Sequence, residues 1–162
     1  MARCGKGYQM TLSWVPTNGV GVPKGAICAG DGVYVGRAKH RGDVIPGSLV
    51  PADGMVYVSY GGNSHPKKTF EVLCATGFNT CPAFQWKKDQ RGHTPRNALV
   101  GGVSEYGDPL YVARTVLDGK CVVGKVHNGH TCGYFPHEGK EVSEDKYEVL
   151  IWCRTPWNAV AD

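Results

Sequence analysis

The chain contains an internal duplication, and this feature constrains its fold more than any other. The segment that starts at Trp14 matches the segment that starts at Trp86, and from Asp31 and Asp108 onward the copies align without a gap. The coinciding positions include glycines, tyrosines and apolar residues: Tyr34/Tyr111, Gly42/Gly119, Gly47/Gly124, Tyr57/Tyr134 and Leu73/Leu150. Ordered matches of this kind are hard to obtain by chance and predict two similar units. We place the units at residues 12–76 and 84–152, joined by the stretch TGFNTCPAF.

The repeated unit is predicted to consist of short strands. VYVGRA and LYVART are rich in β-branched and aromatic residues, MVYVSYGG alternates between two faces, and FEVLC and YEVLIWC close the two copies. Residues 138–155 lack helix breakers for long enough to suggest a helix, but the match of YEVL to FEVL favours a strand there. We therefore predict an all-β fold made of two tandem, pseudo-symmetric antiparallel β repeats.

One copy alone is close to the size below which a hydrophobic core becomes marginal. We therefore expect the two copies to pack around a pseudo-twofold axis and to share one core. The large aromatic residues of the repeat are the expected contributors to that core: Trp14, Trp86, Tyr57 and Tyr134.

Residues 41–43 spell Arg-Gly-Asp, the tripeptide of cell-adhesion ligands. The second copy has Asp118-Gly119-Lys120 at this place, so the two copies share only the glycine. A glycine there fits the tip of a tight hairpin, where a positive φ is needed. We interpret the tripeptide as a hairpin tip, and an adhesion loop is the alternative because such a tip is expected to be exposed.

Charge and hydropathy argue against several classes of protein. The net charge of +4 is small and evenly spread, and Lys67-Lys68 and Lys87-Lys88 are short runs, so we expect no nucleic-acid partner. The N-terminal stretch has no apolar signal region, so we expect a cytoplasmic protein, and its release by a non-classical route stays open. We interpret the seven cysteines as mostly buried or free thiols, and a disulfide between some pair stays open.

The ordered motifs WVP, VYVGRA, GDVIPGS, VYVSYGG and FEVL of the first copy closely resemble the DM9 repeat, also called the natterin-like lectin repeat. The resemblance covers about residues 12–152, in two copies. It implies a protein that is not an enzyme, needs no cofactor and binds mannose-type glycans as a recognition molecule in innate immunity or host-pathogen contact. Self-association as a homodimer is also expected, because a single weak sugar site binds poorly.

The resemblance also implies a sugar site made by an acidic residue in the loop after Gly-Gly and a lysine in the Pro-Gly-Lys turn. The first copy has Ser48 in place of this lysine, whereas the second copy retains Lys125 and has Glu105 in its loop. We therefore expect the better site in the second copy, with Lys125 donating hydrogen bonds to the sugar and Glu105 accepting them. The other expected sugar-binding residues are Ser104, Tyr106 and Asp108 in that loop, and Asp31 and Asp43 in a weaker site of the first copy.

The chemistry of sugars fits this pair of residues. Hydroxyl groups are uncharged donors and acceptors that suit a carboxylate and an ammonium, and an aromatic side chain such as Tyr106 can cover the C–H face of the ring. No cluster of Asp and Asn suited to calcium is visible, so recognition is expected to be calcium-independent. Lys125→Ala and Glu105→Ala are each expected to eliminate mannan binding with the fold intact, and Lys39→Ala is expected to retain binding. The alternative for Glu105 and Lys125 is an exposed ion pair without function.

Three rival functions compete with a lectin: an enzyme with a zinc site, a pore-forming protein and an interaction module, of which the interaction module is the serious alternative. His127, His130, Cys132 and His137 stand close together in HNGHTCGYFPH and offer ligands for zinc, although the first copy has no counterpart. Pore formation occurs where natterin-like repeats are joined to a membrane-inserting module, but only a short segment follows the second copy, so no membrane insertion is expected. An intracellular interaction module with a decayed sugar site would explain the substituted site residues. Motifs for phosphate binding, a nucleophile elbow or a zinc protease are absent from the sequence.

Overall fold

The structure is a computed structural model that describes residues 12–17, 21–75 and 84–152. Every regular element within these ranges is a strand, so the predicted all-β fold is confirmed. The described part of the chain contains no helix that is long and apolar enough to cross a membrane. In chain order the strands are β1 (Leu12–Thr17), β2 (Cys28–Gly30), β3 (Val33–His40), β4 (Asp43–Val50), β5 (Met55–Tyr60), β6 (Asn63–Lys67), β7 (Phe70–Ala75), β8 (Phe84–Gln90), β9 (Val100–Val103), β10 (Pro109–Leu117), β11 (Lys120–His127), β12 (Gly133–His137), β13 (Lys140–Glu144) and β14 (Lys146–Trp152).

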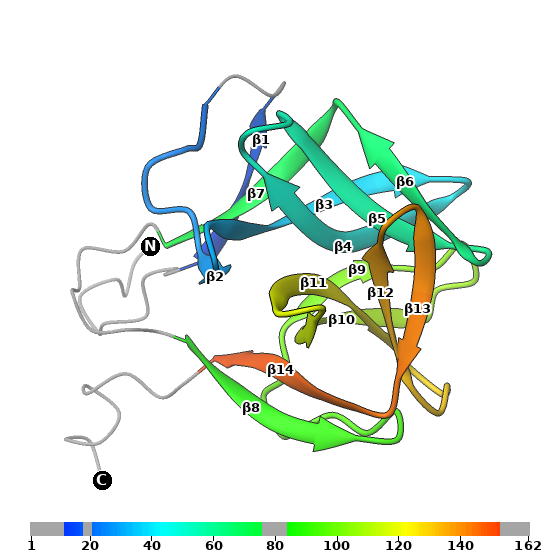
Figure 1. The fold of residues 1–162 in the computed structure, drawn as a ribbon. Coiled ribbons are helices and arrows are strands. Elements are labelled where there is room, and N and C mark those ends of the chain that lie inside the picture. Colours follow the sequence, from blue (N-terminus) through cyan, green and yellow to red (C-terminus); the bar gives the residue numbers. More distant parts are fainter. Residues whose placement is uncertain (1–11, 18–20, 76–83, 153–162) are drawn as a thin grey trace, which may run out of the picture.

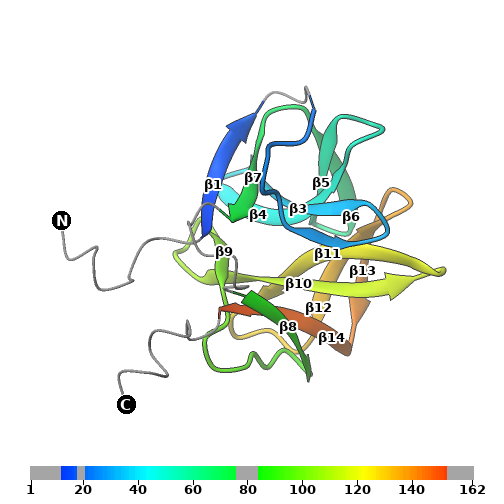
Figure 2. The same cartoon turned by 90° about the vertical axis from the view of Figure 1, so that its left-hand side faces the viewer.

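The order of the strands in space repeats itself in mirror image. The path β1-β7-β3-β4-β5-β6 continues as β13-β12-β11-β10-β14-β8, so each strand of the first half has a counterpart at the same place in the second. β2 and β9 lie off this path, beside β3 and β10. Figures 1 and 2 show the first seven strands stacked above the last seven. The predicted pseudo-symmetric arrangement is therefore confirmed, whereas the joining stretch at 76–83 lies outside the described residues.

The two halves share a hydrophobic core, as the sequence predicts. One cluster of buried side chains draws on both halves: Leu12, Ile27, Ala29, Val35 and Leu73 from the first, and Val112, Cys121, Val123 and Leu150 from the second. Trp14 and Trp86 are partly buried and pack against this cluster. Tyr57 and Tyr134 are half-buried and belong to none of the core clusters, so their assignment to the core is wrong. The Tyr57 hydroxyl instead donates to Asp53 Oδ2 at 2.7 Å.

One arginine in each half donates a hydrogen bond to the backbone of the other half. The Arg37 guanidinium lies 4.3 Å from the centre of the Trp14 ring, and its Nε donates to Glu71 Oε1 at 2.8 Å. Its Nη1 donates to the backbone oxygen of Gly101, in the other half, at 3.3 Å. The counterparts in the second half are Arg114, Trp86 and Glu148, with Ala29 of the first half as the backbone acceptor at 2.7 Å. Both arginines therefore serve the fold and the junction between the halves.

The glycines shared by the two copies mark close backbone contacts. A Cβ atom on Gly47 would lie 2.0 Å from the backbone oxygen of Tyr57, and one on Gly124 would lie 2.1 Å from that of Tyr134. Real Cβ atoms do not approach a carbonyl oxygen so closely, so any other residue at these points would force the paired strands to shift. The repeat therefore keeps glycine at both positions.

The Arg-Gly-Asp tripeptide is a hairpin tip, as we interpreted it. Arg41 and Gly42 have φ values of 48° and 87°, between β3 and β4. Asp43, however, is only 6% exposed, and its Oδ1 accepts a hydrogen bond from the backbone N–H of Glu105 at 2.8 Å. The adhesion alternative needs this carboxylate at the surface, so the structure contradicts it.

Candidate functional site

A small polar pocket lies where the β3–β4 hairpin of the first half meets the β9–β10 loop of the second. Its cavity volume is about 260 Å³. Pockets for drug-sized ligands measure roughly 300–1,000 Å³, so this one is suited to a single small ring. The first half contributes Asp43, Tyr60 and Gly61, and the second half contributes Ser104, Glu105, Tyr106, Lys125, His127, His130, Tyr134 and Glu141.

The β9–β10 loop is held in shape by Ser104. Its hydroxyl oxygen accepts hydrogen bonds from the backbone N–H groups of Tyr106, at 3.3 Å, and Asp108, at 3.1 Å. The backbone of Ser104 also donates to the oxygen of Asp108 and accepts from Gly107, both at 2.9 Å. Ser104 is 5% exposed, so it fixes the loop from inside and presents the next two side chains to the pocket.

Glu105 is anchored by the other half of the molecule. Its N–H donates to Asp43 Oδ1, and its carboxylate lies over the hairpin tip, where a Cβ on Gly42 would meet Glu105 Oε2 at 3.1 Å. None of the ion pairs between described residues involves Glu105. Tyr106 is 85% exposed, and the neighbouring Glu105 carboxylate raises the pKa of its hydroxyl. The loop therefore offers a carboxylate and an aromatic ring side by side.

Lys125 lies at the bottom of the pocket and is 5% exposed. Its Nζ donates to the backbone oxygen of Ser59, in the first half, at 2.7 Å and lies 3.6 Å from Glu141 Oε2. Glu141 Oε1 in turn accepts from the backbone N–H of Gly62 at 3.0 Å. Burial lowers the pKa of Lys125 from its ordinary value, and the carboxylates of Glu141 and Asp43 oppose this shift.

This environment changes two expectations for Lys125. Its counter-ion is Glu141 and not Glu105, and the pair is buried, so the alternative of an exposed Glu105–Lys125 ion pair does not hold. Lys125→Ala would strand the Glu141 carboxylate, whose side chain is 12% exposed, and is expected to destabilise the protein. The prediction that this variant leaves the fold intact is therefore revised.

Two tyrosines flank the lysine. The rings of Tyr60 and Tyr134 lie with their centres 5.7 Å and 5.8 Å from Lys125 Nζ. At these distances an ammonium is attracted to the ring faces. Burial raises the pKa of Tyr134 to about 12, so its hydroxyl is neutral and able to donate.

Two stacked histidines close one side of the pocket. The rings of His127 and His130 have centres 4.0 Å apart and planes 11° from parallel. His127 Nε2 lies 3.2 Å from Asp108 Oδ2, and His130 Nδ1 lies 2.8 Å from the Tyr134 hydroxyl. Partial burial, together with the charges of His127 and Lys125, lowers the pKa of His130. Asp108 thus takes part in the site through His127.

The structure does not bring Asp31 and Asp43 together in a site of the first half. Asp31 Oδ2 accepts from the backbone N–H of Cys121 at 2.9 Å, in a different groove from the pocket that Asp43 lines. Ser48, which replaces the lysine of the repeat, is buried, and its hydroxyl donates to the oxygen of Val123 and accepts from its N–H. The weaker first-copy site is therefore corrected: Asp43 belongs to the same pocket as Glu105 and Lys125.

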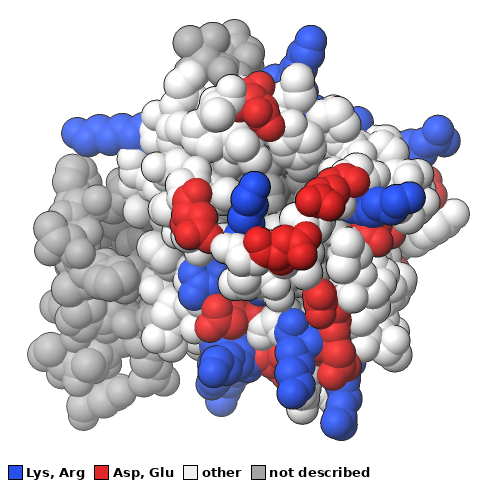
Figure 3. All heavy atoms as spheres, viewed as in Figure 1, with Lys and Arg blue, Asp and Glu red and all other residues white. Residues whose placement is uncertain are grey.

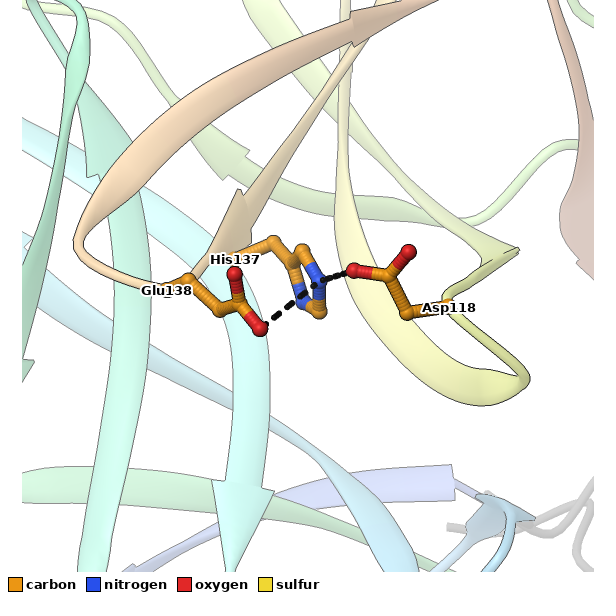
Figure 4. A group of neighbouring side chains, drawn as sticks. All are labelled: Asp118, His137 and Glu138. Atoms are coloured by element: carbon orange, nitrogen blue, oxygen red, sulfur yellow. Dashed lines mark hydrogen bonds and ion pairs between the residues drawn. The ribbon is translucent and has the colours of Figure 1, made fainter.

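Among the described residues, the suggested zinc ligands His127, His130, Cys132 and His137 do not come together as one group of metal ligands. His127 and His130 stack in the pocket, whereas His137 lies between Asp118 and Glu138 (Figure 4). His137 Nε2 is 2.8 Å from Asp118 Oδ2 and 3.8 Å from Glu138 Oε1, and both carboxylate side chains are at least 73% exposed. Exposed groups of this composition are common without a metal ion, and we assign none.

Two larger grooves lie at equivalent places in the two halves, with volumes of about 1,230 and 910 Å³. Each is built around one of the structural Arg–Glu pairs, so these grooves follow from the repeated fold. On the face seen in Figure 3, acidic and basic side chains are interspersed and do not form a patch of one sign. The small pocket is the better candidate site because three carboxylates, one lysine and two histidines converge on it.

The sequence did not indicate Tyr60, Tyr134 and Glu141 as residues of the site. Tyr134 coincides with Tyr57 in the repeat and was therefore interpreted as core. Glu141 aligns with Ser64, so the repeat carries no signal for it. His127 and His130 stood out in the sequence, but as metal ligands and not as a wall of a pocket.

An all-β tandem repeat with a convergent polar pocket is an arrangement suited to binding a small polar ligand. A family model described as the DM9 repeat matches residues 29–144, and the chain belongs to the DM9 repeat family. This family is a non-enzymatic type of binding module.

Among solved structures, the chain is similar to the nematode sperm cell motility protein MFP2B, with a TM-score of 0.59 and 16% sequence identity. The match covers 89% of this chain and 42% of that protein, so the chain spans less than half of its length. At this identity the likeness shows a shared fold. No curated protein sequence matches the chain.

Proposed function

We propose that the protein is a lectin that holds one hexose of a mannose-type glycan in the pocket between the two halves. The observation that carries this proposal is the convergence of Glu105, Lys125 and Asp43, which come from three separate turns and strands, on one cavity of about 260 Å³. Membership of the DM9 family supports a binding role.

Each group has a role that its surroundings permit. The Glu105 carboxylate has no counter-ion among the described residues, so it can accept hydrogen bonds from two sugar hydroxyls. Lys125 uses one N–H on Ser59 and faces Glu141 with another, which leaves one N–H for a sugar oxygen. The exposed Tyr106 ring can cover the C–H face of the sugar.

We also propose that the protein acts as a homodimer in recognition of glycan-coated surfaces, as in innate immunity or host-pathogen contact, from a cytoplasmic pool. The described residues contain one such pocket, and a single-ring site binds weakly, so avid binding requires linked copies. Light scattering at working concentration tests this directly: a dimeric mass supports it, and a strictly monomeric mass contradicts it.

A specific observation favours a second function, an interaction module with a decayed sugar site. Lys125 is buried and already engaged by Ser59 and Glu141, so it offers less to a ligand than an exposed lysine would. Absence of binding to every glycan on an array, by a folded protein, would favour this alternative.

The test of the lectin proposal is isothermal titration with methyl α-mannoside and with mannan. Glu105→Ala is expected to weaken binding about 10- to 150-fold, the equivalent of one charged hydrogen bond worth about 1.5–3 kcal/mol. Glu138→Ala is the matched control, because this side chain is 76% exposed and lies outside the pocket. Equal binding by Glu105→Ala and the parent protein would place the sugar elsewhere.

A further inference from the structure

We propose that the pocket selects its sugar by charge: a cationic amino sugar binds more tightly than the neutral sugar of the same shape, and an anionic sugar is rejected. This inference rests on the proposed function, because it specifies the ligand class of the same pocket. The evidence for the inference is the arrangement of charged side chains around the cavity.

Carboxylates outnumber ammonium groups at the pocket wall. Asp43, Glu105 and Glu141 line the cavity, and Lys125 is the one lysine or arginine that does so among the described residues. Lys125 pairs with Glu141, 3.6 Å away, and the exposed fractions of the two side chains are 6% and 12%. Asp43 and Glu105 take part in none of the described ion pairs. The Asp43 carboxylate also favours the charged form of Lys125 from a longer distance, whereas Glu105 has no close basic partner among the described residues.

These two carboxylates are held close to each other. The Glu105 N–H binds Asp43 Oδ1 at 2.8 Å, which fixes the loop that carries one acid against the hairpin that carries the other. Asp43 is only 6% exposed. A carboxylate in such a place lacks the water that would screen it, so a positive charge entering the pocket gains more than it would at an open surface.

Aromatic rings are placed to support a cation. Tyr60 lines the same pocket as Asp43, and the exposed Tyr106 lies beside Glu105. The faces of tyrosine rings attract ammonium groups, as the Tyr60 ring already does for Lys125 Nζ at 5.7 Å. A ligand ammonium near Glu105 would meet a carboxylate and a ring together.

Both histidines of the pocket are engaged by neighbouring side chains. His127 is directed to Asp108, and the His130 ring is stacked on it and bound to the Tyr134 hydroxyl. Burial and the charges of His127 and Lys125 favour the neutral form of His130, against the carboxylates of Asp108 and Glu141. A sugar carboxylate or sulfate would face Asp43 and Glu105, while Lys125 is paired with Glu141 and His127 is directed to Asp108, which disfavours an anionic sugar.

Isothermal titration at pH 7 and low salt with a matched series of sugars tests the inference. The probes are mannose, mannosamine, 6-amino-6-deoxymannose, N-acetylmannosamine as the neutral control, and mannuronate. We expect at least one amino sugar to bind about tenfold more tightly than mannose, N-acetylmannosamine to show no such gain, and mannuronate to show no binding. High salt should shrink the ratio between amino sugar and mannose, because it screens the charges.

Glu105→Gln should bring the ratio of amino-sugar affinity to mannose affinity close to one, whatever its effect on the two affinities themselves. Glu138→Gln should leave this ratio unchanged. If mannose binds and both amino sugars bind no better, or mannuronate binds equally well, charge selection is wrong and the lectin proposal stands. If no sugar of the series and no mannan binds the folded protein, the lectin proposal fails and the inference fails with it.

Discussion

The buried Lys125–Glu141 pair predicts a large loss of stability when one partner is removed. In Lys125→Met the side chain keeps much of its volume, but Glu141 loses its counter-ion and the backbone oxygen of Ser59 loses its donor. Breaking a buried ion pair in this way typically costs about 3–5 kcal/mol. We expect a decrease of this size in the free energy of unfolding.

The magnitude follows from two contacts. The 2.7 Å bond from Nζ to the Ser59 oxygen is charge-assisted, and such bonds contribute about 1.5–3 kcal/mol. The attraction between charges 3.6 Å apart is about 4–5 kcal/mol at an effective dielectric constant of about 20, and the cost of burying Lys125 and Glu141 offsets much of it. The hydrogen bond and the part of the attraction that is not offset together agree with a loss of about 3–5 kcal/mol in the free energy of unfolding of Lys125→Met.

Urea denaturation followed by tryptophan fluorescence measures this loss. A double-mutant cycle with Glu141→Gln measures the interaction between the two side chains. The loss in free energy of unfolding of the double variant should be smaller than the sum of the two single losses, by at least about 1 kcal/mol. Lys140→Met, on the same strand as Glu141 but exposed, is the control and should change stability by less than about 0.5 kcal/mol. A Lys125→Met protein as stable as its parent, or an additive cycle, would refute the role assigned to the pair.

Three further predictions concern strand contacts, acid stability and a buried thiol. Gly124→Ala should destabilise the protein by about 1–3 kcal/mol in urea, because the added Cβ meets the Tyr134 oxygen at 2.1 Å, and unchanged stability would contradict this contact. The melting temperature should fall as pH drops below about 6.5, because burial lowers the folded-state pKa values of His40 and His130, so the unfolded chain binds more protons; a flat profile between pH 7 and 5.5 would count against it. The Cys74 thiol is fully buried and its pKa is raised, so iodoacetamide at pH 8 should label it only after denaturant is added, and mass spectrometry showing labelling of the native protein would disprove its burial.

The fold could be predicted from the sequence because the repeat preserves what the strands need. Gly47 and Gly124 are shared since a carbonyl oxygen of the next strand leaves no room for a Cβ. Trp14 and Trp86 are shared because each ring packs under the arginine of its own copy, Arg37 or Arg114. Constraints that act within each copy therefore appear in the alignment of the copies.

The site could be predicted only in part, because it is made between the copies. The alignment shows that Asp31 corresponds to Asp108, but not that the hairpin carrying Asp43 meets the loop carrying Glu105. The burial of Lys125 could not be predicted from the sequence. It depends on the ion pair with Glu141, and the first copy has no acidic residue at the position that corresponds to Glu141. Contacts across the pseudo-twofold axis join residues that are not equivalent, and a single sequence does not reveal which of them meet.

The central claim is that a mannose-type sugar binds in the pocket between the halves. The most direct measurement is a titration of the ¹⁵N-labelled protein with methyl α-mannoside, followed by NMR of the backbone amides. The largest shifts are expected at Gly61, Glu105 and Tyr106, which line the pocket from both halves, with saturation at one common dissociation constant. Absence of shifts up to high sugar concentration, or shifts confined to the groove around Arg37, would contradict the claim.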